Sequence, residues 1–149
     1  MNGSDNKKMV SFQPCSDFVA AAALTLSNMQ SYYHHYGVDW DAQQIEAMTR
    51  DLVNLDILAD GQVVGVMRLS FDETSCMVRD LQVDPRQQNK GIGAQALSEA
   101  KRLAQAQNLQ RLQLRVFTIS PAARLYQRFG FTLSHRDERF DYMELSLTD

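Results

Sequence analysis

Two glycines separated by one residue, Gly91 and Gly93, stand between a predicted strand and a predicted helix. Glycine has no Cβ, so the backbone at these positions can come close to a ligand. The first turn of a helix also leaves N–H groups without intrahelical partners at its positive dipole end. The stretch is therefore typical of a pyrophosphate-binding loop, with Arg86 and Lys90 adding positive charge. On the two glycines alone, a tight turn into a packed helix is an equally good interpretation.

Two familiar phosphate loops do not fit this stretch. A P-loop has Gly-Lys followed by Ser or Thr, whereas here Lys90 precedes Gly91. A dinucleotide fingerprint has a third glycine where this chain has Ala96, and an acidic residue at the end of a later strand, which the sequence lacks. Neither of these nucleotide-binding classes is therefore predicted.

Hydrophobic periodicity, capping residues and turn residues predict the elements that position the loop. Asp17 and Asp41 are predicted helix N-caps, the second in a capping box with Gln44, and Asp60-Gly61 is a typical hairpin turn. The predicted helices cover residues 17–36, 41–52, 93–107 and a short stretch from Ser120-Pro121 to Gly130. The predicted strands cover residues 55–59, 63–69, 76–83, 111–117, 131–135 and 140–147.

Residue spacing also predicts which faces of the first two helices are buried. The face predicted for the first helix consists of Val19, Ala22, Ala23, Leu26 and Met29. The face predicted for the second helix consists of Ile45, Met48 and Leu52.

The order of the elements predicts a mixed α/β fold on one sheet. The central strand–helix–strand should be parallel, because its crossover contains a helix, and the flanking hairpins should be antiparallel. A length of 149 residues suits a single domain over residues 1–149, and we expect the polar residues 1–9 to be mobile.

Composition excludes several classes of protein and site. The net charge of −3 argues against nucleic acid as a partner, and no apolar stretch is long enough to span a membrane. Cys15 and Cys76 are expected to be reduced, buried thiols of a cytoplasmic protein. No cluster has the ligand spacing of a metal site, and this includes His34-His35.

Two stretches of the chain resemble the GNAT superfamily of N-acetyltransferases. Residues 81–93 resemble motif A, with its defining positions filled by Gln88, Gly91 and Gly93. Residues 120–131 resemble motif B, in which Leu125-Tyr126 precedes Gly130-Phe131, although Ser120 stands where Asn is common. Both motifs occur in the family's order, about thirty residues apart, and the predicted elements match the family over nearly the whole chain.

The resemblance implies a GNAT-like fold: a twisted, mostly antiparallel sheet with a central parallel strand–helix–strand and helices on both faces. It implies acetyl-CoA as co-substrate, held by backbone groups of the motif A strand, by amides of the loop and by motif B. The implied contacts are Leu81, Gln82, Val83, Gln88, Asn89, Lys90, Gly91, Ile92, Gly93, Ala94, Ser120, Tyr126 and Arg128. Arg128 could equally be a plain surface residue.

The resemblance also implies a catalytic acid. Tyr126 matches the motif B tyrosine, which protonates the leaving thiolate. A phenol with a pKa of about 10 suits this transfer to a thiolate. The alternative is that Tyr126 is an aromatic residue packed on the sheet.

A base for the attacking amine is expected next to motif A. Many members of the family have Glu-Asp there, and this chain has Arg79-Asp80. Asp80 could act as the base through a water or bind the substrate ammonium, and could equally form a salt bridge with Arg68 or Arg79. Arg79 would favour an acceptor that carries a carboxylate.

The acceptor site is expected near the end of the first helix, where the family shapes it. Tyr32, Tyr33 and Trp40 are candidates to line an amine pocket, and partial packing of these rings is the alternative.

The predicted activity is N-acetylation of a primary amine, a small molecule or a peptide, by direct attack in a ternary complex. The alternative is a non-catalytic acyl-CoA-binding regulatory module. The sequence does not identify the acceptor, and a homodimer is a further possibility.

Overall fold

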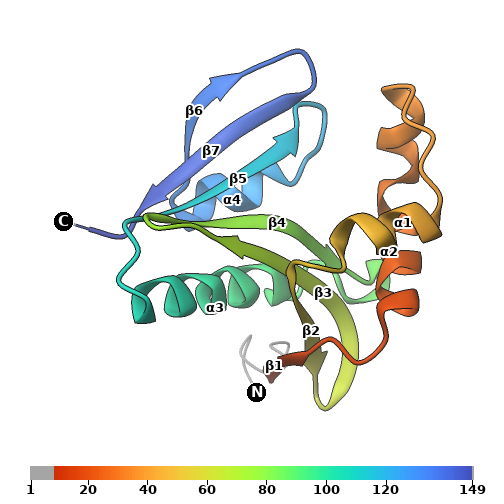
Figure 1. Ribbon diagram of the computed structural model, residues 1–149, viewed down its shortest axis with the longest axis horizontal. Coiled ribbons are helices and arrows are strands. Elements are labelled where there is room, and N and C mark those ends of the chain that lie inside the picture. The colour runs from red at the N-terminus through yellow and green to blue at the C-terminus, as the bar shows by residue number, and fades with distance from the viewer. Residues whose placement is uncertain (1–8, 149) are drawn as a thin grey trace. The chain divides into compact units, whose positions relative to one another are not determined.

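The computed structural model describes residues 9–148 (Figure 1). These residues form a mixed α/β fold with four α-helices and a mostly antiparallel sheet of seven strands, in the order β1-β2-β3-β4-β5-β7-β6. One pair, β4 with β5, is parallel. The predicted fold class is thus confirmed.

The chain divides into two compact units. The first contains the described residues up to Arg68 and Asp80–Ala96, and the second contains Leu69–Arg79 and the described residues from Leu97 onward. The strands β3 (Gln62–Phe71) and β4 (Ser75–Val83) and the helix α3 (Ile92–Ala106) each contribute residues to both units.

The first unit begins with a strand that the sequence analysis missed. β1 (Val10–Pro14) pairs antiparallel with β2 (Val53–Ala59), from Val10 opposite Ala59 to Pro14 opposite Leu55. Five residues carry too little periodicity to predict a strand. Contacts with β2 hold β1 in place, because the buried Asp56 accepts hydrogen bonds from Gln13 and Ser16.

Helix α1 (Phe18–His35) begins at the predicted cap but buries a different face. The Asp17 carboxylate accepts from the Ala20 N–H at 3.0 Å. Of the predicted face only Ala22 is fully buried; Val19 and Ala23 are exposed, and Leu26 and Met29 are half-buried. The face that is buried consists of Ala21, Ala22, Thr25 and Tyr33. The helix is apolar on several sides, so the spacing alone did not determine its orientation.

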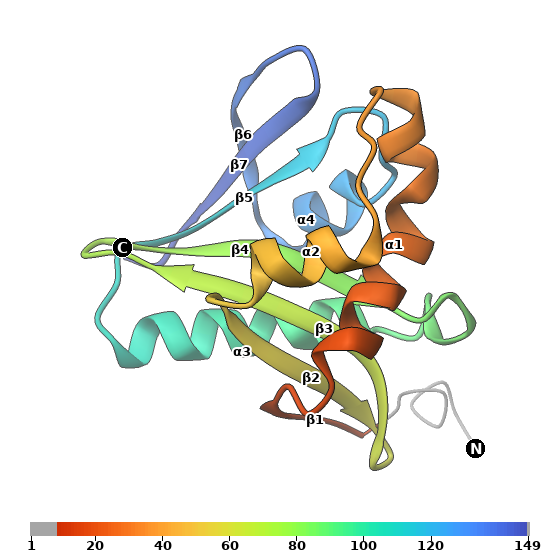
Figure 2. The same ribbon diagram turned by 45° about the vertical axis from the view of Figure 1, so that its right-hand side comes forward.

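Helix α2 (Ala42–Thr49) has the predicted capping box between Asp41 and Gln44. It packs against α1 (Figure 2), and its buried residue is Ile45, which is 2% exposed. The other two residues of the predicted stripe do not take part, because Met48 is exposed and Leu52 follows the end of the helix.

The remaining elements of the first unit agree closely with the sequence analysis. The turn between β2 and β3 has Asp60 at φ 51° and Gly61 at φ 82°, as predicted for this hairpin. Beyond β4, residues Pro85–Gln87 form a short 3₁₀ helix, η2, where only an irregular loop was expected.

The second unit contains the parallel strand pair, a hairpin and a short helix. The pairing of β4 with β5 (Arg111–Phe117) runs from Ser75 opposite Arg111 to Val78 opposite Leu114. β5 pairs antiparallel with β7 (Phe140–Ser146), which also pairs with β6 (Thr132–Arg136).

Helix α4 (Ala123–Phe129) starts slightly later than predicted. The Ser120 hydroxyl accepts from the Ala122 N–H at 3.1 Å, as a cap would, but the regular helix begins only at Ala123. Gly130 ends the helix at φ 121°, as expected for a C-terminal glycine.

Three further predictions concern the thiols, the membrane and the N-terminus. Cys15 and Cys76 are both free thiols, but only Cys76 is buried, so the prediction of burial is wrong for Cys15. Among residues 9–148 no helix has the length and apolar character to cross a bilayer. The expected mobility of residues 1–9 concerns positions that, apart from Met9, lie outside the described part of the chain.

Candidate active site

The last residues of β4 direct alternate backbone groups to opposite sides of the strand. The Asp84 N–H donates to the Val64 carbonyl at 2.8 Å, and a Cβ at Gly65 would overlap the Gln82 carbonyl oxygen. The peptide groups of residues 82 and 84 therefore face β3. Because peptide groups alternate along a strand, those of Leu81 and Val83 point away from β3.

One of these groups already has hydrogen-bond partners. The Val83 carbonyl accepts from Asn28 Nδ2 at 3.0 Å and from Gln88 Nε2 at 3.1 Å. The N–H of the same peptide unit is the Asp84 N–H that donates to Val64. The Val83–Asp84 peptide is therefore held on both sides. The backbone groups that a ligand can bind on the side away from β3 are the Val83 N–H and the N–H and carbonyl of Leu81.

The loop after β4 leads into the N-terminus of α3 as predicted. Asn89 and Gly91 adopt positive φ values of 63° and 79°, and open space surrounds the position of a Cβ at Gly91. In the described part of the chain, the structure records no hydrogen-bond acceptor for the N–H groups of Ile92, Gly93 and Ala94. These N–H groups at a helix N-terminus can bind an anion.

The two cations predicted beside the loop differ in their surroundings. The Arg86 guanidinium is bound to the Asp84 carboxylate at 2.8 Å, and these contacts lower the pKa of Asp84 to about 2. Arg86 is therefore largely neutralised by its neighbour. Within residues 9–148, the hydrogen bond that half-buried Lys90 makes is to the uncharged Gln87 side chain, at 3.4 Å. Of the two, Lys90 is the one whose charge is not neutralised by a contacting carboxylate.

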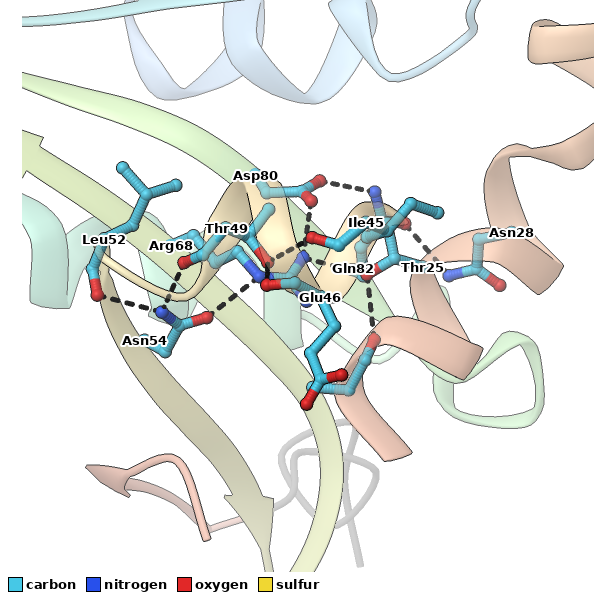
Figure 3. A network of polar contacts seen from close by, with 11 residues as sticks. Thr25, Asn28, Ile45, Glu46, Thr49, Leu52, Asn54, Arg68, Asp80 and Gln82 are labelled. Carbon is cyan, nitrogen blue, oxygen red and sulfur yellow. Dashed lines mark hydrogen bonds and ion pairs between the residues drawn. The ribbon is translucent and has the colours of Figure 1, made fainter. Parts of the chain in front are cut away.

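A buried polar network lies between α1 and strands β2, β3 and β4 (Figure 3). Its centre is Arg68, only 1% exposed, whose Nη1 lies 2.6 Å from Asp80 Oδ2. The same guanidinium donates to Thr25 Oγ1 at 2.8 Å and to Asn54 Oδ1 at 2.9 Å. The side chains of Asn54, Arg68 and Asp80 meet one another, so they lie on one face of their strands, and the contact of Arg68 with Thr25 shows that α1 covers this face.

The network continues from Asp80 to the end of β4. Gln82 Nε2 donates to Asp80 Oδ1 at 2.6 Å, and Gln82 Oε1 accepts from Asn28 Nδ2 at 3.1 Å. Of the roles that the sequence left open for Asp80, these contacts bear out a salt bridge with Arg68. The role of base stays a prediction.

The aromatic candidates for the acceptor site are buried to different degrees. Tyr33 is 8% exposed and contacts Trp40 edge-to-face, with ring centroids 5.2 Å apart. Burial and the charge of Asp80 raise the pKa of Tyr33 to about 12. Tyr32 is half-buried and Trp40 is 39% exposed. Trp40 and Tyr32 are therefore more accessible to a ligand than Tyr33.

The second unit holds the remaining predicted residues. Tyr126 is 9% exposed on α4 and its ring meets that of Phe131 edge-to-face at 6.0 Å. Ser120 is half-buried, and Arg79 and Arg128 are exposed.

The comparisons with known proteins agree on one family. The family model described as the acetyltransferase (GNAT) family matches residues 21–131, well over half of the chain. The chain belongs to the GNAT acetyltransferase family. It is thus an acetyltransferase by family, as the two motifs predicted.

Solved GNAT structures share the fold at low sequence identity. Ard1 from Thermoplasma volcanium is 17% identical over 94% of this chain and 99% of its own, with a TM-score of 0.75. The PaiA N-acetyltransferase from Thermoplasma acidophilum, solved with coenzyme A, is 18% identical over 93% and 99%, with a TM-score of 0.68. YncA from Salmonella typhimurium, solved with acetyl-CoA, is 20% identical over 94% and 95%, with a TM-score of 0.66.

Similarity to a further solved acetyltransferase covers only part of each chain. A nourseothricin acetyltransferase matches over 66% of this chain and 66% of its own, at 23% identity and a TM-score of 0.61. The chain therefore spans about two thirds of that protein's length. A search of curated proteins found no match.

Part of the polar network of this GNAT chain was not predicted from the sequence. Asn28, Thr25 and Asn54 were not predicted to contact anything near motif A, although Arg68 was named as a partner for Asp80. One signal was present: Arg68 interrupts an otherwise apolar strand, and a buried guanidinium must be paired.

Proposed function

We propose that the protein transfers the acetyl group of acetyl-CoA to a primary amine, by direct attack within a ternary complex. The observation that carries this proposal is the end of β4, where the Val83 N–H and the Leu81 peptide point away from β3 next to the anion-binding turn at α3. GNAT family membership supplies the class of reaction. CoA or acetyl-CoA in solved structures of the same fold supports the choice of co-substrate.

The residues of the motif A loop fit such a co-substrate. The N–H groups of Ile92, Gly93 and Ala94 would bind the pyrophosphate, with Lys90 beside them. Open space at Gly91 lets the backbone approach it. Bound acetyl-CoA supplies a thioester, whose carbonyl carbon the amine attacks.

Backbone and side-chain donors then have separate tasks. The Val83 N–H would donate to the thioester oxygen as negative charge develops on it. Loss of one such donor typically costs about 3–4 kcal/mol of barrier. Tyr126 would give its hydroxyl proton to the departing thiolate, and the proton that the amine loses would pass through solvent to the phenolate left on Tyr126. Ser120 and Arg128 would make weaker contacts with the co-substrate.

The proposed acceptor site is formed by residues near the end of α1 and by a residue of β4. Tyr32 and Trp40 would contact the amine substrate, and exposed Arg79 would favour one with a carboxylate. If Arg79→Ala leaves the relative rates for carboxylated and plain amines unchanged, this role of Arg79 is wrong. We also propose that the protein is located in the cytoplasm and forms a homodimer.

The proposal is tested by acetyl-CoA turnover with a panel of amines, comparing the wild type with Tyr126→Phe. We expect one amine to raise CoA release well above background. The variant should lose rate by at least about a hundredfold while it still binds acetyl-CoA, as expected for loss of a general acid.

Tyr142→Phe is the matched control in the same unit. It also removes one phenolic hydroxyl, which donates to Asp137 at 2.8 Å, and it should leave the rate unchanged. If acetyl-CoA binds but no amine is acetylated, a non-catalytic acyl-CoA-binding module becomes the better interpretation. If acetyl-CoA does not bind, the proposal fails altogether.

A further inference from the structure

Asn28 is a helix residue whose side chain reaches the end of β4. Its Nδ2 donates to the Val83 carbonyl at 3.0 Å and to Gln82 Oε1 at 3.1 Å. Its Oδ1 is buried and has no hydrogen-bond partner in the described structure. A buried unpaired acceptor destabilises a protein, so the placement of Asn28 calls for a compensating role.

The side chain of Gln82 is held in turn by an ion pair. Gln82 Nε2 donates to Asp80 Oδ1 at 2.6 Å, and the other carboxylate oxygen of Asp80 binds Arg68 (Figure 3). Arg68 is anchored by Asn54 and Thr25, whose hydroxyl donates to the Ala21 carbonyl of α1. Each amide orientation is thereby determined, because Asp80 accepts only and Asn28 Nδ2 donates only.

The chain of contacts ends on the two peptide groups that flank Val83. The Gln82 carbonyl is pressed against Gly65, and the Val83 carbonyl is bound by Asn28 and Gln88. The Val83 N–H belongs to the same peptide plane as the Gln82 carbonyl, so holding this plane and the next one gives the N–H a single direction. A catalytic hydrogen-bond donor is most effective when it is oriented before the reaction.

We propose that Asn28, Gln82 and the Arg68–Asp80 pair are positioning residues that orient the Val83 N–H toward the bound thioester. This inference rests on the proposed function. It assigns Asp80 a task other than that of base: its carboxylate holds Gln82, and its charge is balanced by Arg68.

The test uses Asn28→Leu, Gln82→Met and the double variant, which leave the ion pair intact. Each substitution is close to the original side chain in size but removes its hydrogen bonds. Ser27→Ala, an exposed neighbour on α1, is the control. Two quantities are measured: the dissociation constant of acetyl-CoA, which carries the thioester, by calorimetry, and amide hydrogen exchange of Asp84 in the ligand-free protein.

Each single variant should weaken acetyl-CoA binding about five- to tenfold, the effect of losing one neutral hydrogen bond. The double variant should bind no more weakly than the poorer single variant, because both act on one contact. Exchange of the Asp84 amide should be faster in all three variants and unchanged in the control.

Three results would overturn the inference. These are acetyl-CoA affinities equal to that of the wild type, fully additive effects in the double variant, or unchanged exchange at Asp84. A fourth would restore Asp80 as the base: Asp80→Asn abolishes the acid limb of the pH–rate profile while Asn28→Leu leaves affinity and rate intact. If wild-type protein itself does not bind CoA, the proposed function has failed instead.

Discussion

At the scale of single residues, the most consequential contact is the buried pair of Arg68 and Asp80. The guanidinium is 1% exposed, and the carboxylate side chain is 19% exposed. Charges at this depth are tolerated only when they are paired and hydrogen-bonded. The pair therefore adds little net stability, but removal of either member alone destabilises the fold.

Substitution of one member should be severe. We expect Arg68→Met to lower the free energy of unfolding by about 3–5 kcal/mol, because it leaves Asp80 without its counter-charge. The double variant Arg68→Met/Asp80→Leu should recover much of this loss. Urea unfolding measures both.

Arg102→Met is the control for this experiment. It breaks an exposed pair with Glu99 on α3 and should cost far less stability than Arg68→Met. Equal losses for Arg68→Met and Arg102→Met would contradict the interpretation.

A second residue-scale prediction concerns Gly65. An added Cβ would overlap the Gln82 carbonyl and lie 3.2 Å from Ile57 Cδ1. Gly65→Ala should therefore destabilise the protein by about 1–3 kcal/mol and weaken CoA binding, because β4 must shift. Denaturant unfolding and calorimetry check the two effects. Val63→Ala, at an exposed position of the same strand, should change stability by less than about 0.5 kcal/mol.

At the scale of elements, a single carboxylate holds the first strand in place. Asp56 Oδ2 accepts from Gln13 Nε2 at 3.0 Å, Ser16 Oγ at 2.9 Å and the Ser16 N–H at 3.1 Å. Burial alone would raise the pKa of Asp56, but these hydrogen bonds outweigh it and lower the pKa below its usual range.

The lowered pKa predicts a pH dependence of stability. A carboxyl group with a lowered folded pKa stabilises the fold above its usual pKa of about 3.9. This contribution is lost as the pH falls through the folded value. Asp56→Asn keeps an acceptor but does not ionise, so it should be less stable than the wild type near neutral pH, by about 1 kcal/mol.

The two stabilities should converge as the pH falls from 4 through the lowered pKa of Asp56, where the carboxyl of the folded wild type becomes protonated. Unfolding at a series of pH values checks this, with Asp51→Asn, at an exposed site, as the control. A constant difference between wild type and Asp56→Asn down to pH 2 would rule out the mechanism.

At the scale of the whole molecule, binding of the co-substrate should stabilise the fold. At a concentration of one hundred times its dissociation constant, a ligand adds about 2.7 kcal/mol. For a chain of 149 residues this corresponds to a rise in melting temperature of about 5–10 °C. Thermal unfolding with acetyl-CoA measures the rise.

A nucleoside triphosphate is the control ligand, since it offers phosphates without a pantetheine arm. It should give a smaller rise than acetyl-CoA at the same concentration. A melting temperature unaffected by acetyl-CoA would argue against both the site and the proposed function.

The sequence by itself determined the order of the elements, their caps and turns, and the family. These are local properties: Asp17, Asp41 and Gly61 act on atoms within a few residues, and motifs A and B are short. Cap positions and the Asp60-Gly61 turn could therefore be predicted correctly. Strand β1 could not, because Gln13 and the Asp56 carboxylate that it contacts are 43 positions apart.

Only the tertiary structure decided which residues meet at the end of β4. Asn28 and Gln82 are 54 positions apart, and Arg68 and Asp80 are 12 apart, so their pairing depends on strand register and on the rotation of α1. The rotation predicted for α1 was wrong, because Ala-rich helices have no single apolar face. Hydrogen bonding of Thr25 and Asn28 to residues of the sheet orients the helix, and a periodicity of apolar residues cannot show this.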